Sequence, residues 1–217
     1  MSWKELKDKH TGETCLIIGN GPSLNDIPLD FLKKYRSFGS NRIYLKLTPD
    51  YYASVNPLVV EQFCHEIDRM NCVKFITDTG GMNWTVRNSL PLRSNGMPMF
   101  SFWPDKWIYE GYTVTYVLMQ LAYFMGFTTA LLVGVDHRFG YEGKPNEERV
   151  LMGEDANHFD PCYFSGMKWN NPDLERSAKA YRLAQVAWEH NGRKIINLTP
   201  NSDLDVFPFD DWRKWNI

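Results

Sequence analysis

Polar residues that could do chemistry cluster where a strand is expected to end. The run Gly19-Asn20-Gly21-Pro22-Ser23 follows a short β-rich stretch, Thr14–Ile18. Two glycines let a backbone approach a ligand closely, and the side chains of Asn20 and Ser23 add hydrogen-bonding groups. The run lacks the third glycine of the dinucleotide fingerprint and the lysine of a P-loop. It therefore predicts a phosphate-approaching turn of another kind, and a tight turn without a ligand is the alternative.

A second group of candidates follows an apolar run near the middle of the chain. Asp136 and His137 end this run, and His158 and Asp160 lie further along. Such residues act as acid–base groups or bind a metal, although single histidines more often pack or lie on the surface. Asp203-Leu204-Asp205 matches the Asp-x-Asp of metal-dependent glycosyltransferases, but a Pro-Asn-Ser turn precedes it where an apolar strand is expected. We therefore expect no bound metal in the favoured hypothesis.

The elements that must position these residues alternate between strands and helices. Spacing of apolar residues predicts a helix from Val114 to Met125, covered on both sides, and a helix with Asn171 as its N-cap that ends near Gly192. A short helix is expected over Pro28–Tyr35. The predicted strands are Thr14–Ile18, Tyr51–Val55, Val73–Thr77, Met97–Phe102, Ala130–Val135 and Lys194–Leu198. This alternation predicts a single α/β domain, residues 1–217, a three-layer sandwich with a mostly parallel sheet.

A long segment, residues 136–171, connects the central strand to the last helix with little periodicity. It leaves the carboxyl end of a strand, where open α/β sheets bind ligands. Loops of this length in compact domains are usually lids, binding loops or disordered segments. We expect a lid over a ligand site, with a disordered insertion as the alternative.

Composition narrows the class of protein. The chain has 217 residues, 24 Lys+Arg against 26 Asp+Glu, and a net charge of -2, which argues against nucleic acid as a partner. The amino terminus lacks an apolar signal segment, no apolar tract is long enough to span a membrane, and the four cysteines form no Cys-x-x-Cys pair, so a reduced cytoplasmic protein is expected. Peripheral membrane contact and oligomer formation stay open. Aromatic residues reach 15%, and those outside the helices gather in residues 84–112 and 139–169.

Several stretches together resemble two related families. They are LIIGNGPSLNDIPLDFL, GSNRIYL, ASVNPLVVEQF, TVTYVLMQLAYFMGFTTALLVGVDHRFGY and NLTPNSDLDVF, in this order along the chain. They resemble the bacterial sialyltransferases of the lipooligosaccharide type, and a family of Rossmann-like domains named after an archaeal 6-hydroxymethylpterin diphosphokinase. The resemblance implies a Rossmann-like nucleotide-binding fold over most of the chain.

The resemblance also implies roles for individual residues. Asn20 and Asn41 would contact the phosphate and ribose of a nucleotide, and Asn56 and Gln62 would face its base or the sugar. The remaining implied positions are Thr113 to Thr115 lining the donor pocket, Pro200, Asn201 and Ser202 against a cytidine, and Tyr141 donating its hydroxyl to the leaving phosphate. Donors of this kind stabilise the charge that develops on a departing nucleotide without a cation.

One departure from the sialyltransferase pattern affects the general base. In that family the base is the second of two histidines four residues apart, and here His158 matches the first while Cys162 stands at the second position. His158 or His137 would then have to act as the base. The favoured hypothesis is a metal-independent transfer of a sugar from a nucleotide-activated donor, such as CMP-sialic acid, to a cell-surface glycan of the lipopolysaccharide type.

Two other hypotheses remain. One is a magnesium-dependent diphosphokinase, in which Asp136 would bind the metal and the Gly19–Ser23 turn would bind phosphates. The other is a nucleotide-binding module without catalysis, which the cysteine at position 162 favours.

Overall fold

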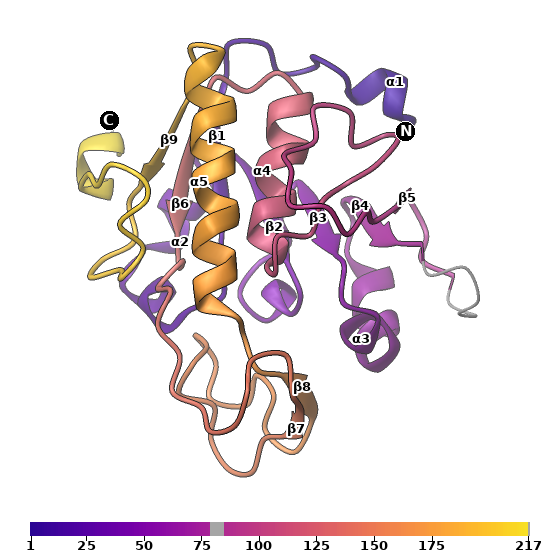
Figure 1. The fold of residues 1–217 in the computed structure, drawn as a ribbon, viewed down its shortest axis with the longest axis vertical. Coiled ribbons are helices and arrows are strands. Elements are labelled where there is room, and N and C mark those ends of the chain that lie inside the picture. Colours follow the sequence, from indigo (N-terminus) through magenta and orange to yellow (C-terminus); the bar gives the residue numbers. More distant parts are fainter. Residues whose placement is uncertain (79–84, 217) are drawn as a thin grey trace.

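The chain folds around one seven-stranded parallel sheet. The computed structural model describes residues 1–78 and 85–216. The strand order is β5-β4-β3-β2-β1-β6-β9, and every neighbouring pair is parallel (Figure 1). The strands are β1 (Thr14–Ile18), β2 (Arg36–Ser40), β3 (Tyr51–Ser54), β4 (Val73–Thr77), β5 (Ser89–Leu92), β6 (Thr129–Val133) and β9 (Lys194–Asn197).

Helices cover both faces of this sheet, which confirms the three-layer α/β prediction. The α-helices are α1 (Trp3–Leu6), α2 (Leu29–Leu32), α3 (Pro57–Arg69), α4 (Val114–Phe124) and α5 (Leu174–His190), and the 3₁₀ helices are η1 (Pro22–Asp26), η2 (Ile43–Leu45) and η3 (Trp212–Trp215). Alternate residues of β1 divide between the two cores: Cys15 and Ile17 pack with α4 and α5, whereas Leu16 and Ile18 pack with α2 and α3.

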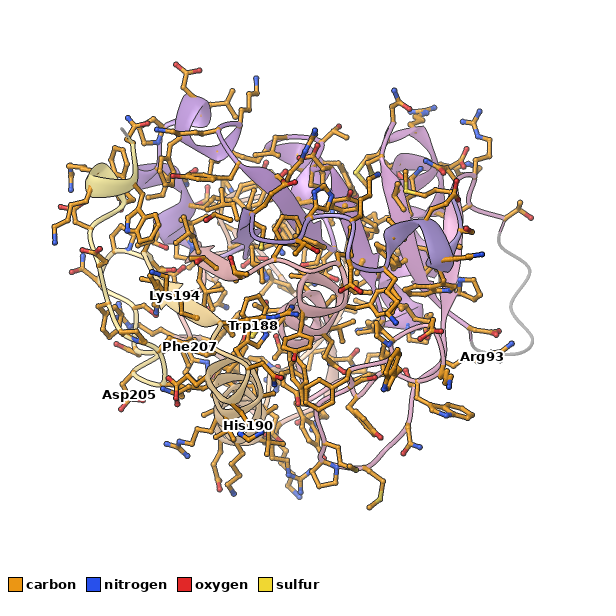
Figure 2. The ribbon with its side chains drawn as sticks, turned by 90° about the horizontal axis from the view of Figure 1, so that it is seen from above. Arg93, Trp188, His190, Lys194, Asp205 and Phe207 are labelled. Atoms are coloured by element: carbon orange, nitrogen blue, oxygen red, sulfur yellow. The ribbon has the colours of Figure 1, made fainter. Side chains whose placement is uncertain are left out.

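The two edges of the sheet lie at opposite ends of the molecule. Seen from above, Arg93, which follows β5, lies far from Lys194, which begins β9 (Figure 2). Trp188 of α5 is fully buried, and it packs against the ring of Tyr123 from α4. The helix α4 is buried on nearly all sides, as its uniformly apolar sequence predicts.

Some predicted elements differ from the structure. Residues 97–102 form no strand, because the segment runs beside α4 and its apolar residues pack on that helix or face solvent. The last helix begins two residues later than predicted: Asp173, not Asn171, is the N-cap, because its carboxylate accepts the amide of Arg176. The helix α3 and the strands β2 and β5 were not predicted.

The 136–171 segment has a structure of its own. Strands β7 (Glu148–Val150) and β8 (Lys168–Asn170) form an antiparallel pair below the sheet (Figure 1). The core that α3 also forms buries Phe159, Tyr163 and Phe164, which lie between these strands, and Trp169 of β8. In the described residues, no helix is long and apolar enough to cross a membrane.

Candidate functional site

A cavity of about 1120 Å³ opens at the carboxyl ends of β2, β3 and β4. Asn41 and Asp78 line it directly after β2 and β4, and Asn56 lines it two residues after β3. The segments that connect β5 to α4, the hairpin β7–β8 and the first turns of α5 form its other walls. The cavity therefore lies at the edge where parallel α/β sheets bind ligands.

The predicted site residues divide into two groups. Asn41, Asn56, Thr113 and His158 line the cavity. Outside its lining lie the Gly19–Ser23 turn (Gly19, Asn20, Gly21, Pro22, Ser23), Gln62, Thr115, Asp136, His137, Tyr141, Asn201 and Ser202. The structure thus brings together four of the predicted residues and places the others in neighbouring contacts.

His158 is held in a fixed orientation at the cavity wall. Its Nδ1 lies 2.8 Å from Oδ2 of Asp155, a residue that is 3% exposed. The imidazole stacks on Tyr163, with ring centroids 4.0 Å apart and an angle of 3° between the planes. Asp155 also accepts the amide of Phe164. A carboxylate at Nδ1 favours the tautomer that leaves Nε2 as a proton acceptor, which suits a general base.

The start of α4 presents backbone amides that no side chain of the described residues caps, although the amide of Tyr116 donates to the carbonyl of Thr113 at 3.1 Å. Thr113 is the N-cap and makes no capping hydrogen bond from its side chain to a described residue. The residues before it, Gly111 and Tyr112, have φ of 58° and 62°. Such a φ is unusual for a tyrosine and often marks a functional site. The first amides of a helix carry partial positive charge, so this end of α4 favours an anion.

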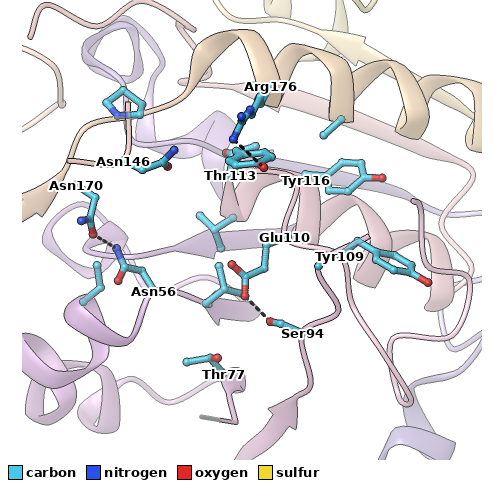
Figure 3. Close-up of a pocket in the computed structure, with 18 of the residues that line it drawn as sticks. Asn56, Thr77, Ser94, Tyr109, Glu110, Thr113, Tyr116, Asn146, Asn170 and Arg176 are labelled. Atoms are coloured by element: carbon cyan, nitrogen blue, oxygen red, sulfur yellow. Dashed lines mark hydrogen bonds between the residues drawn. The ribbon is translucent and has the colours of Figure 1, made fainter. Parts of the chain in front are cut away.

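A cationic side chain lies beside these donors. Arg176 reaches from α5 towards the start of α4, where its Nη1 donates to the hydroxyl of Tyr112 at 3.1 Å (Figure 3). The Nε of Arg176 lies 3.7 Å from Asp173, and the side chain is 57% exposed. Arg176 and the α4 amides together could bind a phosphate or carboxylate.

Amide side chains join the hairpin to α3 at another wall. Asn56 caps α3 by accepting the amide of Leu58, and its Nδ2 donates to Oδ1 of Asn170 at 3.0 Å (Figure 3). Gln62 exchanges hydrogen bonds with the backbone of Lys168. These contacts hold β8 against α3, so Gln62 supports the wall from outside the cavity.

One buried acceptor in the lining has no partner. Asn171 is 1% exposed, and its Nδ2 donates to the carbonyls of Glu142 and Lys144. Its Oδ1 is buried without a hydrogen bond to any described residue. A buried acceptor of this kind is costly unless a ligand or water satisfies it.

The Gly19–Ser23 turn is hydrogen-bonded to the carboxylate of Asp136. Asp136 accepts the amide of Ser23 at 3.2 Å and its hydroxyl at 2.7 Å. A Cβ on Gly21 would lie 1.8 Å from Oδ2 of Asp136, and one on Gly19 would lie 2.3 Å from the carbonyl oxygen of Gly134. Burial raises the pKa of Asp136, and the hydrogen bonds from Ser23 partly oppose this rise. Internal packing therefore accounts for both glycines.

Asn20 holds the turn beside the next strand. Its Nδ2 lies 3.3 Å from the carbonyl oxygen of Ser40, at the end of β2, and its own carbonyl accepts the amide of Phe159 at 3.0 Å. Its Oδ1 is buried and lacks a hydrogen-bond partner among the residues described. Asn20 thus links the turn to both β2 and the 136–171 segment.

The Pro200–Ser202 turn closes the end of β6. Ser202 donates its hydroxyl to the carbonyl of Val135 at 2.7 Å. Arg138 forms two hydrogen bonds of 2.7 Å with Asp203 and one with the carbonyl of Asn201. One carboxylate of the Asp-x-Asp sequence is therefore paired with an arginine.

His137 and Tyr141, the other two predicted catalytic residues, also contact other residues of the protein. His137 has φ of 55° and lies edge-on to the ring of Tyr181. Burial lowers the pKa of His137, although Asp203 and Asp205 oppose this. Tyr141 donates its hydroxyl to the carbonyl of Pro172 at 3.0 Å.

The diphosphokinase hypothesis places a magnesium ion at Asp136. Both carboxylate oxygens of Asp136 accept hydrogen bonds from Ser23. Within residues 1–78 and 85–216, no group of three His, Cys, Asp or Glu side chains is arranged to hold a metal ion. Mg²⁺ is commonly held by one or two carboxylates together with the phosphates of a substrate and water, so these contacts do not decide against the diphosphokinase hypothesis.

Comparisons with known proteins place the chain in a family. Residues 1–142 match the model of the family described as 6-hydroxymethylpterin diphosphokinase MptE-like. The chain belongs to this family. The match covers β1 to β6 and α4, and it ends before the hairpin, His158 and α5.

A solved structure is also similar to the chain. The sialyltransferase CstII from Campylobacter jejuni, solved in complex with a substrate analogue, cytidine-5'-monophosphate, is 16% identical with a TM-score of 0.49. The alignment covers 92% of this chain and 85% of that one. No curated protein matches the sequence.

Sequence reasoning missed several residues of this MptE-like protein that shape the cavity. Asp155, Tyr112 and Arg176 were not candidates, and Asn171 was expected only to cap a helix. Asp155 precedes His158 by three residues, and this spacing was the one available signal. Arg176 lies on a helix whose polar face gives no indication of a cavity, so only the packing of α5 against α4 identifies it.

Proposed function

We propose that the cavity binds a nucleotide-activated sugar and that the protein transfers the sugar to an acceptor hydroxyl. One observation carries the proposal: a histidine oriented by a buried carboxylate and an open helix N-terminus with an arginine line the same cavity. A transferase needs both a base for the acceptor and a positive environment for the leaving phosphate.

The proposed mechanism follows from these two groups. The phosphate of the donor binds at the amides of α4 and Arg176, where the charge that develops on the leaving nucleotide is stabilised. Nε2 of His158 takes the proton of the acceptor hydroxyl. The acceptor oxygen then forms a bond to the anomeric carbon of the sugar, and the bond from that carbon to the phosphate oxygen breaks with its electron pair passing to the phosphate.

The cavity lining supports a sugar as the transferred group. Asn41, Asn146 and Asn170 offer amide groups that both donate and accept hydrogen bonds, as neighbouring hydroxyls require. Phe164 and Trp169 line another part of the cavity with aromatic surface. We propose a CMP-linked donor and a cell-surface glycan acceptor, with Asp155 as the residue that positions the base.

A second candidate function is a nucleotide-dependent diphosphokinase. The match to the family described as 6-hydroxymethylpterin diphosphokinase MptE-like favours it. Such a reaction transfers a diphosphate from a nucleotide triphosphate and normally uses magnesium to bridge the phosphates. The two candidates therefore differ in the nucleotide that binds and in the need for a metal.

The test is a thermal unfolding screen with CMP, CDP, UDP, GDP and ATP, each with and without magnesium. A ligand at 100 times its Kd stabilises the folded state by about 2.7 kcal/mol, which gives a measurable rise in Tm. We expect CMP and CDP to raise the Tm without magnesium. A rise with ATP and magnesium alone would overturn the transferase proposal in favour of the diphosphokinase.

Turnover separates the remaining outcomes. Release of the sugar from a CMP-sugar donor should continue in the presence of a chelator, because the proposed mechanism uses no cation. Donor binding without turnover, with or without a panel of glycan acceptors, would instead identify a nucleotide-binding module.

A further inference from the structure

Five large apolar side chains in one short segment face solvent. Residues 97–107, which we call the aromatic loop, lie between β5 and α4. Its exposed members are Met97 at 59%, Met99 at 50%, Phe102 at 42%, Trp103 at 51% and Trp107 at 52%. Exposed tryptophans and methionines gathered in this way usually mark a binding surface.

The aromatic loop is held firmly from below. Gln120 of α4 is fully buried, and its Oε1 accepts the amides of Ser101 and Tyr109, both at 3.1 Å. Its Nε2 donates to the carbonyl of Tyr109 at 2.7 Å. A single buried amide therefore holds the middle of the loop and the residue that follows it by two positions against α4.

Hydrogen bonds within the loop fix the backbone at Trp103 and Trp107. Ser101 donates its hydroxyl to the carbonyl of Trp107 at 2.6 Å. The amides of Lys106 and Trp107 donate to the carbonyl of Trp103 at 2.9 and 3.2 Å. The exposure of Trp103 and Trp107 is thus a property of an ordered turn.

Two ammonium groups accompany the exposed rings. The Nζ of Lys7 lies 4.6 Å from the centre of the Trp103 ring, and that of Lys106 lies 5.9 Å from it. Lys7 follows α1, which lies beside the loop (Figure 1). Neither ammonium is in an ion pair with a carboxylate of the described residues. Both are available to an anionic partner.

We infer that the aromatic loop docks on an anionic lipid bilayer. Tryptophan prefers the boundary between headgroups and acyl chains, and lysines beside it add attraction to anionic lipids. A protein partner fits less well, because ordinary protein interfaces use about 20–30 residues a side, whereas five side chains of one loop form this surface.

The loop also borders the cavity. Met97 and Met99 line the cavity and belong to the exposed surface. Docking would therefore hold the cavity beside the bilayer, where it could receive an acceptor that carries a lipid anchor. This last step rests on the proposed function, whereas the docking itself does not.

The experiment measures co-sedimentation of the protein, residues 1–217, with lipid vesicles. Vesicles of equimolar phosphatidylcholine and phosphatidylglycerol should bind the protein at least tenfold more tightly than pure phosphatidylcholine. The double variant Trp103→Ser/Trp107→Ser should lose at least tenfold in affinity for the anionic vesicles. The matched control, Met152→Ser/Val186→Ser, removes side chains that are 83% and 64% exposed elsewhere and should bind like the parent protein.

Three results would overturn the inference. They are equal binding by the tryptophan variant and the parent protein, an equal loss in the control variant, and concentration-dependent dimers that the tryptophan substitutions abolish. The last would assign the loop to contact between copies of the chain. Circular dichroism and the Tm verify that each variant is folded.

Substitutions of Lys7 and Lys106 test the electrostatic attraction to anionic lipids separately. Lys7→Gln and Lys106→Gln should each weaken binding to the anionic vesicles about fivefold and leave binding to phosphatidylcholine unchanged. No change in either variant would contradict the electrostatic part of the inference. Vesicle binding needs no nucleotide, so failure of the nucleotide screen alone would remove the proposed function and leave the docking surface standing.

Discussion

Two sets of backbone donors in this molecule differ in what satisfies them. The Gly19–Ser23 turn follows β1, and the carboxylate of Asp136 accepts the amide of Ser23. The start of α4 has no such carboxylate on its first amides in the described structure, and it opens into the cavity with Arg176 beside it. The first set is closed by the protein, whereas the second is open to a ligand.

This difference shows why a glycine-rich turn alone does not identify an anion site. The residue that closes the Gly19–Ser23 turn lies 113 positions further along the chain. Burial raises the pKa of Asp136, so its environment favours the neutral acid more than water does. An anionic ligand at this turn would have to displace that side chain, while at α4 it would meet amides that no side chain of the described residues caps.

The largest expected effect is a loss of turnover in the variant His158→Gln, which changes the cavity that the start of α4 opens into. General base catalysis typically contributes about 10²–10⁴-fold, so kcat for sugar transfer should fall by about that factor. The nucleotide affinity should stay within about threefold, because the phosphate contacts are made by other residues. Steady-state kinetics and a binding titration measure the two quantities separately.

The control for this variant is a substitution at Asp136, the residue that closes the Gly19–Ser23 turn. Asp136→Asn keeps an oxygen that can accept the amide of Ser23, so kcat should change by less than about tenfold. If Asp136→Asn abolished turnover while His158→Gln did not, the roles of the two regions would be reversed and the diphosphokinase would be favoured.

The second effect is a loss of stability in Gly19→Ala. Its Cβ would meet the backbone of Gly134 at 2.3 Å, which a side-chain movement cannot relieve. Overpacking of this kind costs typically 1–3 kcal/mol, and a backbone clash should reach about 3 kcal/mol or more. Urea unfolding measures the change in the free energy of unfolding.

Gly96→Ala is the matched substitution on the cavity side. No atom lies within 4 Å of the position that its Cβ would take, so stability should change by less than about 0.5 kcal/mol. Equal stability of the two variants would show that the Gly19–Ser23 turn has room for a ligand after all.

The third effect is on affinity in Arg176→Gln. Loss of one charge-assisted hydrogen bond should weaken nucleotide binding about tenfold, with kcat affected less. Arg182→Gln, on the same helix but outside the cavity lining, is the control and should bind normally. An unchanged Kd for the Arg176 variant would place the phosphate elsewhere.

The fold could be predicted largely from local patterns. Continuous apolar runs such as Ala130–Val135 and the spacing in Val114–Met125 correspond to β6 and α4 because both elements are buried on all sides. Residues 97–102 misled the prediction because exposed methionine and aromatic residues have the composition of a strand. The signal for β2 was weak, since Arg36–Ser40 contains serine, glycine and arginine.

The site could be predicted only in part. Asn41 and Asn56 were found through the resemblance to known families, and both line the cavity because the topology brings the ends of β2 and β3 together. Tyr112 and Arg176 depend on how α4 and α5 pack, and Asp155 depends on the folding of the 136–171 segment, so no local pattern identifies them. The closure of the turn by Asp136 likewise depends on a long-range contact.

The smallest expected effect is on the pH dependence of stability, and it concerns His137, which follows Asp136 in the chain. Burial lowers the pKa of His137 below its usual 6.5, so the folded state binds fewer protons than the unfolded state as the pH falls below 6.5. The free energy of unfolding therefore carries no penalty from His137 above pH 6.5, and it decreases as the pH falls below that value. His137→Asn keeps a residue that tolerates a positive φ and removes the titration. The free energy of unfolding of the parent protein should fall more than that of the variant between pH 7 and pH 5. If the free energies of unfolding of the parent protein and the variant fell in parallel, His137 would be as accessible to water as a group that lines the cavity. The contrast between the closed Gly19–Ser23 turn with its neighbours and the open start of α4 would then not hold.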